Sequence, residues 1–426
     1  MKLNTEEVYK LFLQCTSVTT DSRNCPANSL FVALKGASFN GNAFAANAVA
    51  AGSKFAIVDE AEYADGKSIF LVDDCLLMLQ SLARLHRETL GTTVIGITGT
   101  NGKTTTKELV ASVLQKKYNL LYTQGNLNNQ IGVPLTVLRL TKEHELAVVE
   151  MGASHPGDIE ELVAIAEPNF GLITNVGHAH ILGFGSFEGV VKTKGELYDF
   201  IRKNGGKIFR NADNSILASI SQGLDAVLYG VSESNYVHAH SLGASPFLKV
   251  EWNGTAIQTH LIGDYNFENV MAAIAVGSYF GVPSADIVAA LEAYQPSNNR
   301  SQFKDTGKNH LIIDAYNANP TSMAAALNNF AAMDVPSKML VLGDMKELGG
   351  DSEMEHDKVV EWLKKHDFKS VCLVGDCFKL AAKGNFNCFA NVDELNEWLK
   401  ANPVSDANIL IKGSNSTKLI KAVDFL

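Results

Sequence analysis

Gly-Ile-Thr-Gly-Thr-Asn-Gly-Lys-Thr-Thr-Thr, at residues 96–106, is the strongest local signal in this sequence. An apolar run at 94–97 precedes it, and a helical pattern from about Thr104 to Lys117 follows it. A glycine-rich turn between a strand and a helix is the context of a phosphate-binding loop, because backbone N–H groups converge there at a helix N-terminus. Lys103 would reach the β- and γ-phosphates and the hydroxyl of Thr104 would bind Mg²⁺, so the stretch predicts a phosphate site.

The loop departs from the common pattern G-x-x-x-x-G-K-[ST] at one position. That pattern requires a glycine where this chain has Ile97, and the glycines stand at positions 96 and 99 instead. The alternative interpretation is a tight glycine turn followed by a surface lysine. The position of the stretch between a strand and a helix favours phosphate binding over that alternative.

Strand-like runs alternate with helical stretches on both sides of the loop, a pattern typical of α/β domains built on mostly parallel sheets. A chain of 426 residues is long enough for about three domains. We predict a small N-terminal α/β domain over 1–90, a central P-loop ATPase-like domain with a parallel sheet over 91–297, and a C-terminal Rossmann-like domain over 298–426. The polar, proline-bearing stretch 295–299 marks the second boundary, and the turn-rich stretch 225–262 predicts a small antiparallel excursion.

The last third of the chain carries four apolar runs, each followed by a helical stretch, at 311–313, 339–342, 371–374 and 409–411. Four consecutive β-α units predict a Rossmann-like sheet whose ligands lie beyond the carboxyl ends of the strands. Those ends carry Asp314-Ala315-Tyr316-Asn317, Gly343-Asp344-Met345, Gly375-Asp376 and Lys412-Gly413-Ser414.

Composition and charge exclude several classes of protein. The formal net charge of −10 argues against non-specific nucleic-acid binding, which needs a basic surface. No run of 18 apolar residues appears and no apolar leader follows the first residues, so we expect neither membrane insertion nor a signal peptide. The six cysteines form no C-x-x-C pair, which favours a reducing compartment. We expect a cytoplasmic protein.

The loop variant Thr-Gly-Thr-Asn-Gly-Lys-Thr-Thr, at 98–105, resembles the form found in the Mur ligase family. The resemblance continues in order across nearly the whole chain. Its further stretches are 20–23, 31–36, 125–134, 150–153, 180–186, 192–196, 316–320, 322–323, 342–345, 347–349 and 412–414. Each stretch is weak alone, but their joint order and spacing are very specific.

The resemblance implies a three-domain ligase that uses ATP and Mg²⁺ to form a peptide bond on a nucleotide-linked cell-wall precursor. In the family, the first domain holds the UDP part of the substrate, the central domain ATP and the third domain the incoming amine. The stretches Tyr-Asn-Ala-Asn-Pro at 316–320 and Gly-Asp-Met…Glu-Leu-Gly at 343–349 resemble the member that adds D-alanyl-D-alanine to UDP-N-acetylmuramoyl-tripeptide. The alternatives are a relative that adds one amino acid, a folate-type glutamate ligase and an ATP-binding regulatory protein. We expect a monomer.

The resemblance also implies the residues of the ATP and metal sites. The metal ligands, with Lys103 as the catalytic cation, would be Thr104, Glu150, His180 and Lys194, the lysine as a carbamate. The ATP contacts would be Gly99, Thr100, Asn101, Gly102, Lys103, Thr104, Thr105, Asn266, Asn269, Arg300 and Asp314. Tyr265 stands before Asn266 where relatives often have histidine, and Asn299 stands before Arg300 where they usually have glycine.

The substrate contacts follow from the same resemblance. Ser22 and Arg23 resemble the UDP contacts of the first domain, where arginine suits phosphate because its planar fork donates two hydrogen bonds. Nearby, Asn40-Gly41-Asn42 replaces the Asp-Gly-His that the family often has. The remaining candidates are Asn128 and Asn129 for the sugar and peptide, and Tyr316, Asn317, Asn319, Lys412 and Ser414 in the third domain.

Several of these assignments compete with plainer ones from the residues alone. Glu150 would be a solvated acid at a strand end, and Asn266 would be a helix N-cap. His178 lies near His180, and Lys192 near Lys194, so each pair contains two candidates. The family register selects His180 and Lys194.

Overall fold

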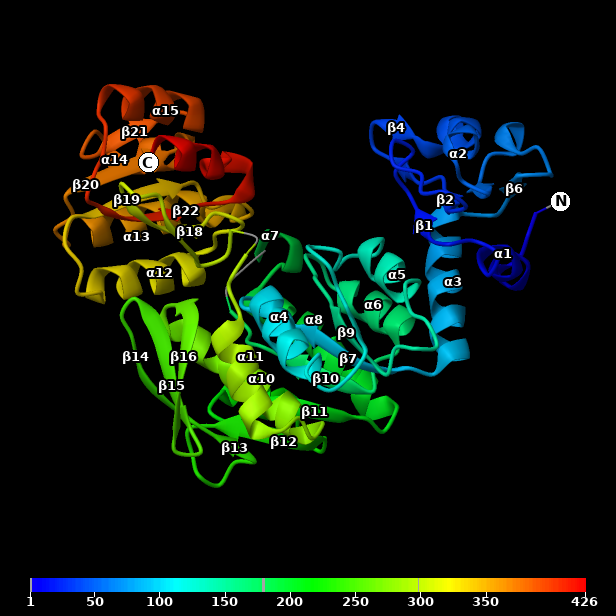
Figure 1. Cartoon of the computed structure of the whole chain (residues 1–426). Coiled ribbons are helices and arrows are strands. Elements are labelled where there is room, and N and C mark those ends of the chain that lie inside the picture. Colours follow the sequence, from blue (N-terminus) through cyan, green and yellow to red (C-terminus); the bar gives the residue numbers. More distant parts are fainter. Residues whose placement is uncertain (1, 178–180, 298) are drawn as a thin grey trace.

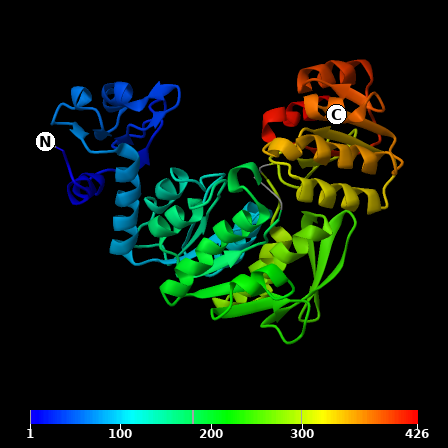
Figure 2. The same ribbon diagram turned by 180° about the vertical axis from the view of Figure 1, so that it is seen from behind.

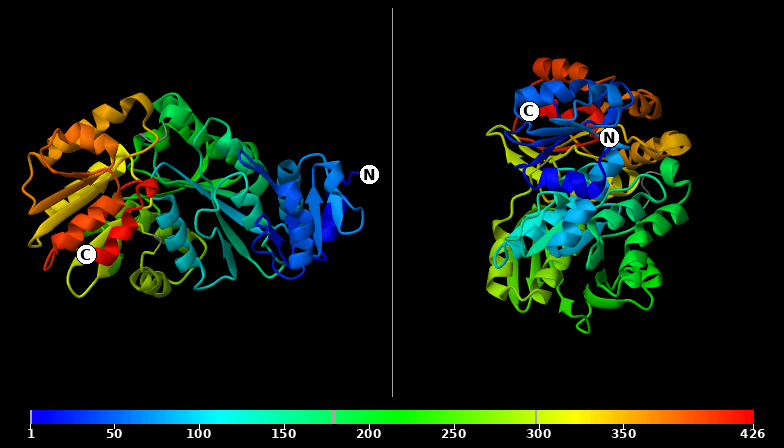
Figure 3. Two further views of the ribbon diagram at one scale, coloured as in Figure 1. Left: turned by 90° about the horizontal axis from the view of Figure 1, so that it is seen from above. Right: turned by 90° about the vertical axis from the view of Figure 1, so that its right-hand side faces the viewer.

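Three α/β domains form an arc in the computed structural model, which describes residues 2–177, 181–297 and 299–426. The central domain lies between the other two, which stand apart from one another in Figures 1 and 2. Seen from above in Figure 3, the three domains follow one another in a row. The predicted α/β class with three domains is confirmed.

The first domain is built on a four-stranded parallel sheet in the order β1-β2-β5-β6. Its strands are β1 (Val18–Thr19), β2 (Leu30–Val32), β5 (Phe55–Val58) and β6 (Ile69–Leu71), with a hairpin of β3 (Lys35–Gly36) and β4 (Phe39–Asn40). Its helices are α1 (Thr5–Phe12), α2 (Ala45–Ala51) and α3 (Cys75–Leu90). Helix α2 ends at Gly52, whose φ of 134° suits glycine. Helix α3 runs down onto the central domain in Figure 1.

The central domain holds a seven-stranded parallel sheet in the order β13-β12-β11-β10-β7-β9-β8. Its strands are β7 (Thr93–Thr98), β8 (Leu120–Tyr122), β9 (Leu146–Glu150), β10 (Phe170–Ile173), β11 (Lys207–Asn211), β12 (Asp225–Gly230) and β13 (Val237–His238). Its helices are α4 (Lys103–Leu114), α5 (Gly132–Val137), α6 (Asp158–Ala166), α7 (Ile181–Phe184), α8 (Phe187–Lys203), α9 (Ser215–Ile220), α10 (Phe267–Tyr279) and α11 (Ser284–Ala293). The phosphate-loop stretch joins β7, which lies between β10 and β9 in the sheet, to α4, as predicted.

The antiparallel excursion is shorter than the sequence predicted. Only β14 (His240–Ala244), β15 (Phe247–Trp252) and β16 (Thr255–Ile262) form an antiparallel sheet. Strands β12 and β13, which also fall within 225–262, extend the parallel sheet instead. The prediction was wrong there because short, alternating segments at a sheet edge have the same pattern in either pairing.

The third domain has a six-stranded sheet in the order β17-β18-β22-β19-β20-β21, parallel except for β17. The four predicted runs are β18 (His310–Asp314), β19 (Lys338–Gly343), β20 (Ser370–Val374) and β22 (Asn408–Lys412). The sequence missed the edge strands β17 (Gln302–Asp305) and β21 (Asn387–Phe389). The helices are α12 (Pro320–Ala332), α13 (Ser352–Leu363), α14 (Asp376–Ala382) and α15 (Val392–Ala401).

The apolar cores explain how the domains are joined. One core of buried side chains runs without a break from the first domain into the central sheet, through Leu79, Leu82 and Val137. The third domain has cores on both faces of its own sheet. Within the described parts of the chain, every helix is too short or too polar to span a bilayer.

Candidate active site

A cavity of about 850 Å³ opens between the central and third domains. It is lined from the central domain by the phosphate loop, by the ends of β9 and β10 and by the start of α10. The third domain contributes the ends of β18 and β22 and the start of α12. The carboxyl ends of two parallel sheets therefore face one space, as the strand-end rule predicts.

The phosphate loop is tightly folded where it approaches its neighbours. Gly99 has a φ of 143°, and a Cβ there would lie 2.0 Å from the hydroxyl oxygen of Thr174. Gly102, at the N-cap of α4, has a φ of 78° and supplies no side-chain cap to the first helical turn. The first-turn N–H groups of α4 are therefore left for an anion.

The Lys103 side chain folds back over the phosphate loop. Its Nζ donates to the carbonyl oxygens of Gly99 at 2.7 Å and Thr100 at 2.9 Å. Burial, together with the charge of Arg300, lowers the pKa of Lys103 to about 8, against the opposing effect of Glu150. A bound polyphosphate would stabilise the charged form, so the site fits an anion.

Two residues that sequence reasoning missed hold the loop in place. The N–H of Asn101 donates to Oδ1 of Asn175 at 3.0 Å, and the N–H of Thr100 donates to the Asn175 carbonyl at 2.9 Å. The Thr174 hydroxyl donates to the Asn101 carbonyl at 2.7 Å. Both residues follow β10, and a polar pair at the end of a strand beside β7 was the available signal.

Glu150 ends β9 and is fully buried, so it is not a solvated acid. Its Oε1 accepts hydrogen bonds from the hydroxyl of Thr104 at 3.1 Å and the amide of Asn128 at 2.8 Å. Its Oε2 is buried and has no hydrogen-bond partner among the described residues. A buried carboxylate oxygen without a donor, beside a threonine hydroxyl, fits a hard divalent cation such as Mg²⁺.

The structure separates the two candidate lysines of α8. Lys194 is 2% exposed and its Nζ lies 5.4 Å from the centre of the Phe184 ring, whereas Lys192 is exposed. Burial and the nearby charge of Lys103 lower the pKa of Lys194 to about 7. A neutral amine is the form that reacts with CO₂, so these surroundings favour Lys194 over Lys192. His178 and His180 lie outside the described residues.

The asparagine pair at the start of α10 faces the phosphate loop. Asn266 donates to the Ile262 carbonyl at 2.8 Å, and Asn269 donates to Oδ1 of Asn266 at 2.8 Å. The Asn266 side chain makes no capping bond, which removes the plain N-cap interpretation. The hydroxyl of Thr106 donates to Oδ1 of Asn269 at 2.9 Å, and a Cβ on Gly102 would lie 2.5 Å from that oxygen. The pair therefore ties α10 to the loop.

The third domain brings charged groups to the same cavity. Nζ of Lys412, which is 1% exposed, lies 2.5 Å from Oδ2 of Asp314. Arg300 lies over the ring of Tyr316, with 3.9 Å between its Cζ and the ring centre. All four residues line the cavity.

Four other predicted contacts have different surroundings. Asn319 lines the cavity and donates its amide to Oδ1 of Asn101 at 2.8 Å, across the domain boundary. Asn317 and Asn129 line it with exposed side chains. Ser414 is buried, accepts a hydrogen bond from the N–H of Lys346 at 3.0 Å and lies outside the cavity lining of the described chain.

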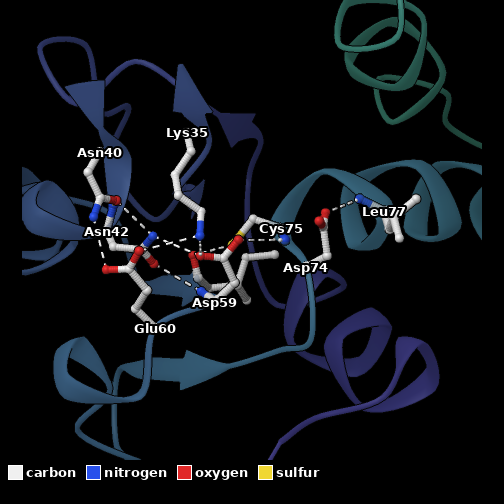
Figure 4. A network of polar contacts seen from close by, with 9 residues as sticks. Lys35, Asn40, Asn42, Asp59, Glu60, Asp74, Cys75 and Leu77 are labelled. Atoms are coloured by element: carbon white, nitrogen blue, oxygen red, sulfur yellow. Dashed lines mark hydrogen bonds and ion pairs between the residues drawn. The ribbon is translucent and has the colours of Figure 1, made fainter. Parts of the chain in front are cut away.

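Ser22 and Arg23 lie in the first domain, away from this cavity. The Arg23 side chain is 88% exposed and pairs with both carboxylate oxygens of Asp21. Asn42, in the segment that departs from the family pattern, is buried and exchanges hydrogen bonds with Asp59 (Figure 4). Lys35 pairs with the same carboxylate at 2.9 Å. The segment that departs from the family pattern therefore forms part of a polar network inside the first domain, centred on Asp59.

A second polar cluster lies under the third-domain sheet edge. The ligand-type atoms of Asp344, His356 and Cys377 lie within 4.8 Å of one another. Nε2 of His356 accepts the N–H of Met345 at 3.0 Å, and Asp344 accepts the N–H groups of Cys377 and Phe378. These hydrogen bonds tie the end of β19 to α13 and α14, so we assign the cluster a structural role.

The fold and site define a three-domain protein with a phosphate-binding loop facing a cavity shared by two sheets. Three family models match it in sequence: the Mur ligase family catalytic domain at 14–87, the Mur ligase middle domain at 97–277 and the Mur ligase glutamate ligase domain at 299–415. The chain belongs to the Mur ligase family.

Named relatives narrow the likeness further. The UDP-N-acetylmuramoyl-tripeptide–D-alanyl-D-alanine ligase of Escherichia coli is 36% identical over 422 residues, covering 96% of this chain and 92% of the relative. The crystal structure of MurF from Acinetobacter baumannii superposes with a TM-score of 0.86 at 29% identity, covering 100% of this chain and 98% of that one. MurF ligase from Thermotoga maritima in complex with ADP has a TM-score of 0.84 at 25% identity, covering 97% of each chain.

Proposed function

We propose that this protein is an ATP-dependent ligase that joins D-alanyl-D-alanine to the peptide carboxylate of UDP-N-acetylmuramoyl-tripeptide in peptidoglycan precursor synthesis. The observation that carries the proposal is a phosphate loop opening into a cavity whose far wall is the third domain. The proposal is supported by full-length likeness to relatives that carry this activity in their names. The sequence of the segment 316–320, which resembles that of the dipeptide-adding member, favours the dipeptide over a single amino acid.

The chemistry requires an activated carboxylate, because an amine cannot expel oxide from a carboxylate at neutral pH. Transfer of the γ-phosphoryl group of ATP breaks its bond to the bridging oxygen and makes an acyl phosphate. The amine then attacks the carbonyl carbon, phosphate leaves and the amine gives up a proton. Little covalent help is needed from the protein, so charge stabilisation and positioning supply the rate.

We assign the charge stabilisation to Lys103 and Arg300, and the orientation of the nucleotide to the loop 99–105 with Asn266 and Asn269. The carboxylate of Asp314 would neutralise the buried charge of Lys412 on the third-domain side of the cavity. The amide of Asn128 orients Glu150 toward the cavity.

Thr104 and Glu150 would hold Mg²⁺, together with His180 and a carbamate of Lys194. When bound, the ion neutralises phosphate charge and polarises the transferred group. The carbamate forms when the neutral amine of Lys194 adds to CO₂ and loses a proton. The burial of Lys194, which together with the charge of Lys103 lowers the pKa of its amine, supports this assignment.

The domain roles follow the same proposal. We assign the UDP part of the acceptor to residues 1–90 with Ser22 and Arg23, ATP to 91–297, and the amine to 298–426. Asn129 faces the acceptor peptide and Asn317 the amine.

A mass-resolved ligation assay tests the proposal. Purified protein receives ATP, Mg²⁺, UDP-N-acetylmuramoyl-tripeptide and either D-alanyl-D-alanine or single amino acids. We expect a product heavier by one dipeptide with one phosphate released per bond. Product with a single amino acid only would move the protein to a sister activity, and phosphate release without acceptor or amine would indicate a regulatory ATPase.

A further inference from the structure

The segment Tyr316–Asn319 belongs to the third domain, yet two of its side chains contact groups on the ATP side of the cavity. The Tyr316 ring carries the guanidinium of Arg300, 3.9 Å from its centre. The Asn319 amide donates to Oδ1 of Asn101 in the phosphate loop at 2.8 Å. Both contacted groups, Arg300 and Asn101, are among those that we assign to ATP, and all of these residues line one cavity.

The backbone around Arg300 is held independently of its side chain. Asn299 and Ser301 both have left-handed backbones, with φ of 57° and 45°. The Asn299 carbonyl accepts the N–H of Ala315 at 3.0 Å, and the Ser301 hydroxyl lies 2.8 Å from the hydroxyl of Tyr265. These bonds fix where the arginine side chain starts, and the Tyr316 ring fixes where it points.

Arg300 and Lys103 need such a support because they repel. Both residues line the same cavity, so two cations face one space. Without a bound anion, the guanidinium of Arg300 has no favourable charge interaction with Lys103 in the cavity. An aromatic face beneath the guanidinium offsets the repulsion through a cation–π contact.

Asn319 uses both ends of its amide. Its Oδ1 accepts the N–H of Ser322 at 2.8 Å and so caps α12, while its Nδ2 reaches Asn101. Asn101 is in turn fixed to the central sheet through Asn175. The start of α12 is therefore tied to the loop that would hold the phosphates.

We propose that Tyr316 and Asn319 are positioning residues for phosphoryl transfer, setting Arg300 and the phosphate loop, and do not contact the incoming amine. This inference rests on the proposed function. It assigns the segment typical of the dipeptide-adding member to the first half of the reaction. Amine recognition then falls to other third-domain residues that line the cavity.

Phosphoryl transfer can be followed without the amine. With ATP labelled by ¹⁸O in its β,γ bridge, transfer to the tripeptide carboxylate breaks the bond between the γ-phosphorus and that oxygen. The bound ADP rotates its β-phosphate, and the reverse transfer re-forms ATP with the label in a non-bridging position. The rate of scrambling thus reports on the first step alone.

The variants are matched in pairs. Tyr316→Leu removes the aromatic face but keeps bulk, whereas Tyr316→Phe keeps the face. Asn319→Ser keeps a capping oxygen for α12 but cannot reach Asn101, and Asn319→Ala loses both contacts. Thermal unfolding of each variant reports whether the fold is intact.

We expect scrambling to slow about tenfold in Tyr316→Leu and Asn319→Ser, with Tyr316→Phe restored toward wild type and the KM for the dipeptide unchanged in all three. If Tyr316→Leu and Asn319→Ser scrambled the label at the wild-type rate but had a raised KM for the dipeptide, the inference would be overturned. Calorimetry gives a readout that needs no turnover: the affinity for a non-hydrolysable ATP analogue should fall about tenfold in Tyr316→Leu and be restored in Tyr316→Phe. Equal affinities in the two variants would also overturn it.

The failure of the proposed function looks different. A wild-type protein that binds nucleotide but neither scrambles label nor ligates the dipeptide would reject the ligase assignment. The calorimetric comparison of Tyr316→Leu with Tyr316→Phe would still decide whether Tyr316 positions Arg300.

Discussion

The two domain junctions of this molecule are built differently. The first domain joins the central one through α3, which packs against α5 and α6 in a continuous apolar core. The third domain joins it through polar contacts gathered around the cavity, such as that between Asn319 and Asn101. One junction resembles a domain interior, and the other resembles a binding site.

The first junction is also fixed by buried polar groups. Arg87 of α3 donates to the carbonyl oxygens of Ala166 and Glu167 and to Oδ1 of Asn169. Nε2 of His86 lies 2.9 Å from the Leu140 carbonyl, and Gln80 reaches Glu161 beside the cavity. Separating these elements would leave several buried groups unpaired.

The second junction has a smaller apolar part. Phe247 of β15 meets Phe303 of β17 with ring centres 5.4 Å apart, and Ile262 joins the third-domain core. From this difference we expect the first junction to contribute mainly to the stability of the protein and the second mainly to its turnover. A polar junction can rearrange when ATP and amine arrive on separate domains, as ligases that close on their substrates require.

The largest expected effect comes from the group at the centre of the polar junction. Lys103→Ala should lower kcat about 10³-fold, because the cation that meets the transferred phosphoryl group is lost. Steady-state phosphate release measures it. Lys116→Ala, an exposed lysine just beyond the same helix, is the matched control. Near-normal turnover in Lys103→Ala would contradict the site.

Lys194→Ala should lower activity about 10²-fold, with part of it restored by formate or acetate, because the lost group acts as a carboxylate. Lys192→Ala, the exposed neighbour, should keep wild-type rates and show no response to added carboxylates. Rescue of Lys192→Ala instead would show that the assignment between the two lysines is reversed.

Arg87→Ala should act on the other junction. We expect the free energy of unfolding to fall by about 3 kcal/mol, because the buried charged donor of Arg87 and its three hydrogen bonds, one of them to the buried Ala166, are lost. Denaturant unfolding measures it, with Ser81→Ala, at an exposed position of the same helix, as a control. KM for ATP should stay near wild type, and a loss of ATP affinity without a loss of stability would break the comparison.

The smallest expected effect is a change of shape. Small-angle scattering should show a lower radius of gyration with an ATP analogue and the UDP-linked tripeptide, because the third domain moves against the other two. Without ligands, Asn319→Ser should have a larger radius of gyration than the wild type, because the contact between Asn319 and Asn101 across the junction is lost. An unchanged wild-type curve would count against domain closure at the polar junction.

Much of the fold could be predicted from the sequence because it depends on local patterns of residues. The loop at 96–106 and the buried runs of β18, β19, β20 and β22 each carry their own strand or turn signal. The strands β12 and β13 were assigned to the wrong sheet, and β17 and β21 were missed, since pairing at an edge depends on distant partners. Thr174 and Asn175 were missed because their role lies in what they contact.

The sequence by itself determined the family, the phosphate loop and the residues at the strand ends, because glycine spacing and apolar periodicity act over a few residues. The tertiary structure was needed to distinguish the buried Lys194 from the exposed Lys192, since burial depends on what packs against α8. It likewise turned Tyr316 and Asn319 toward the ATP side. Asn319 and Asn101 lie 218 positions apart in the chain, and only packing brings such a pair together.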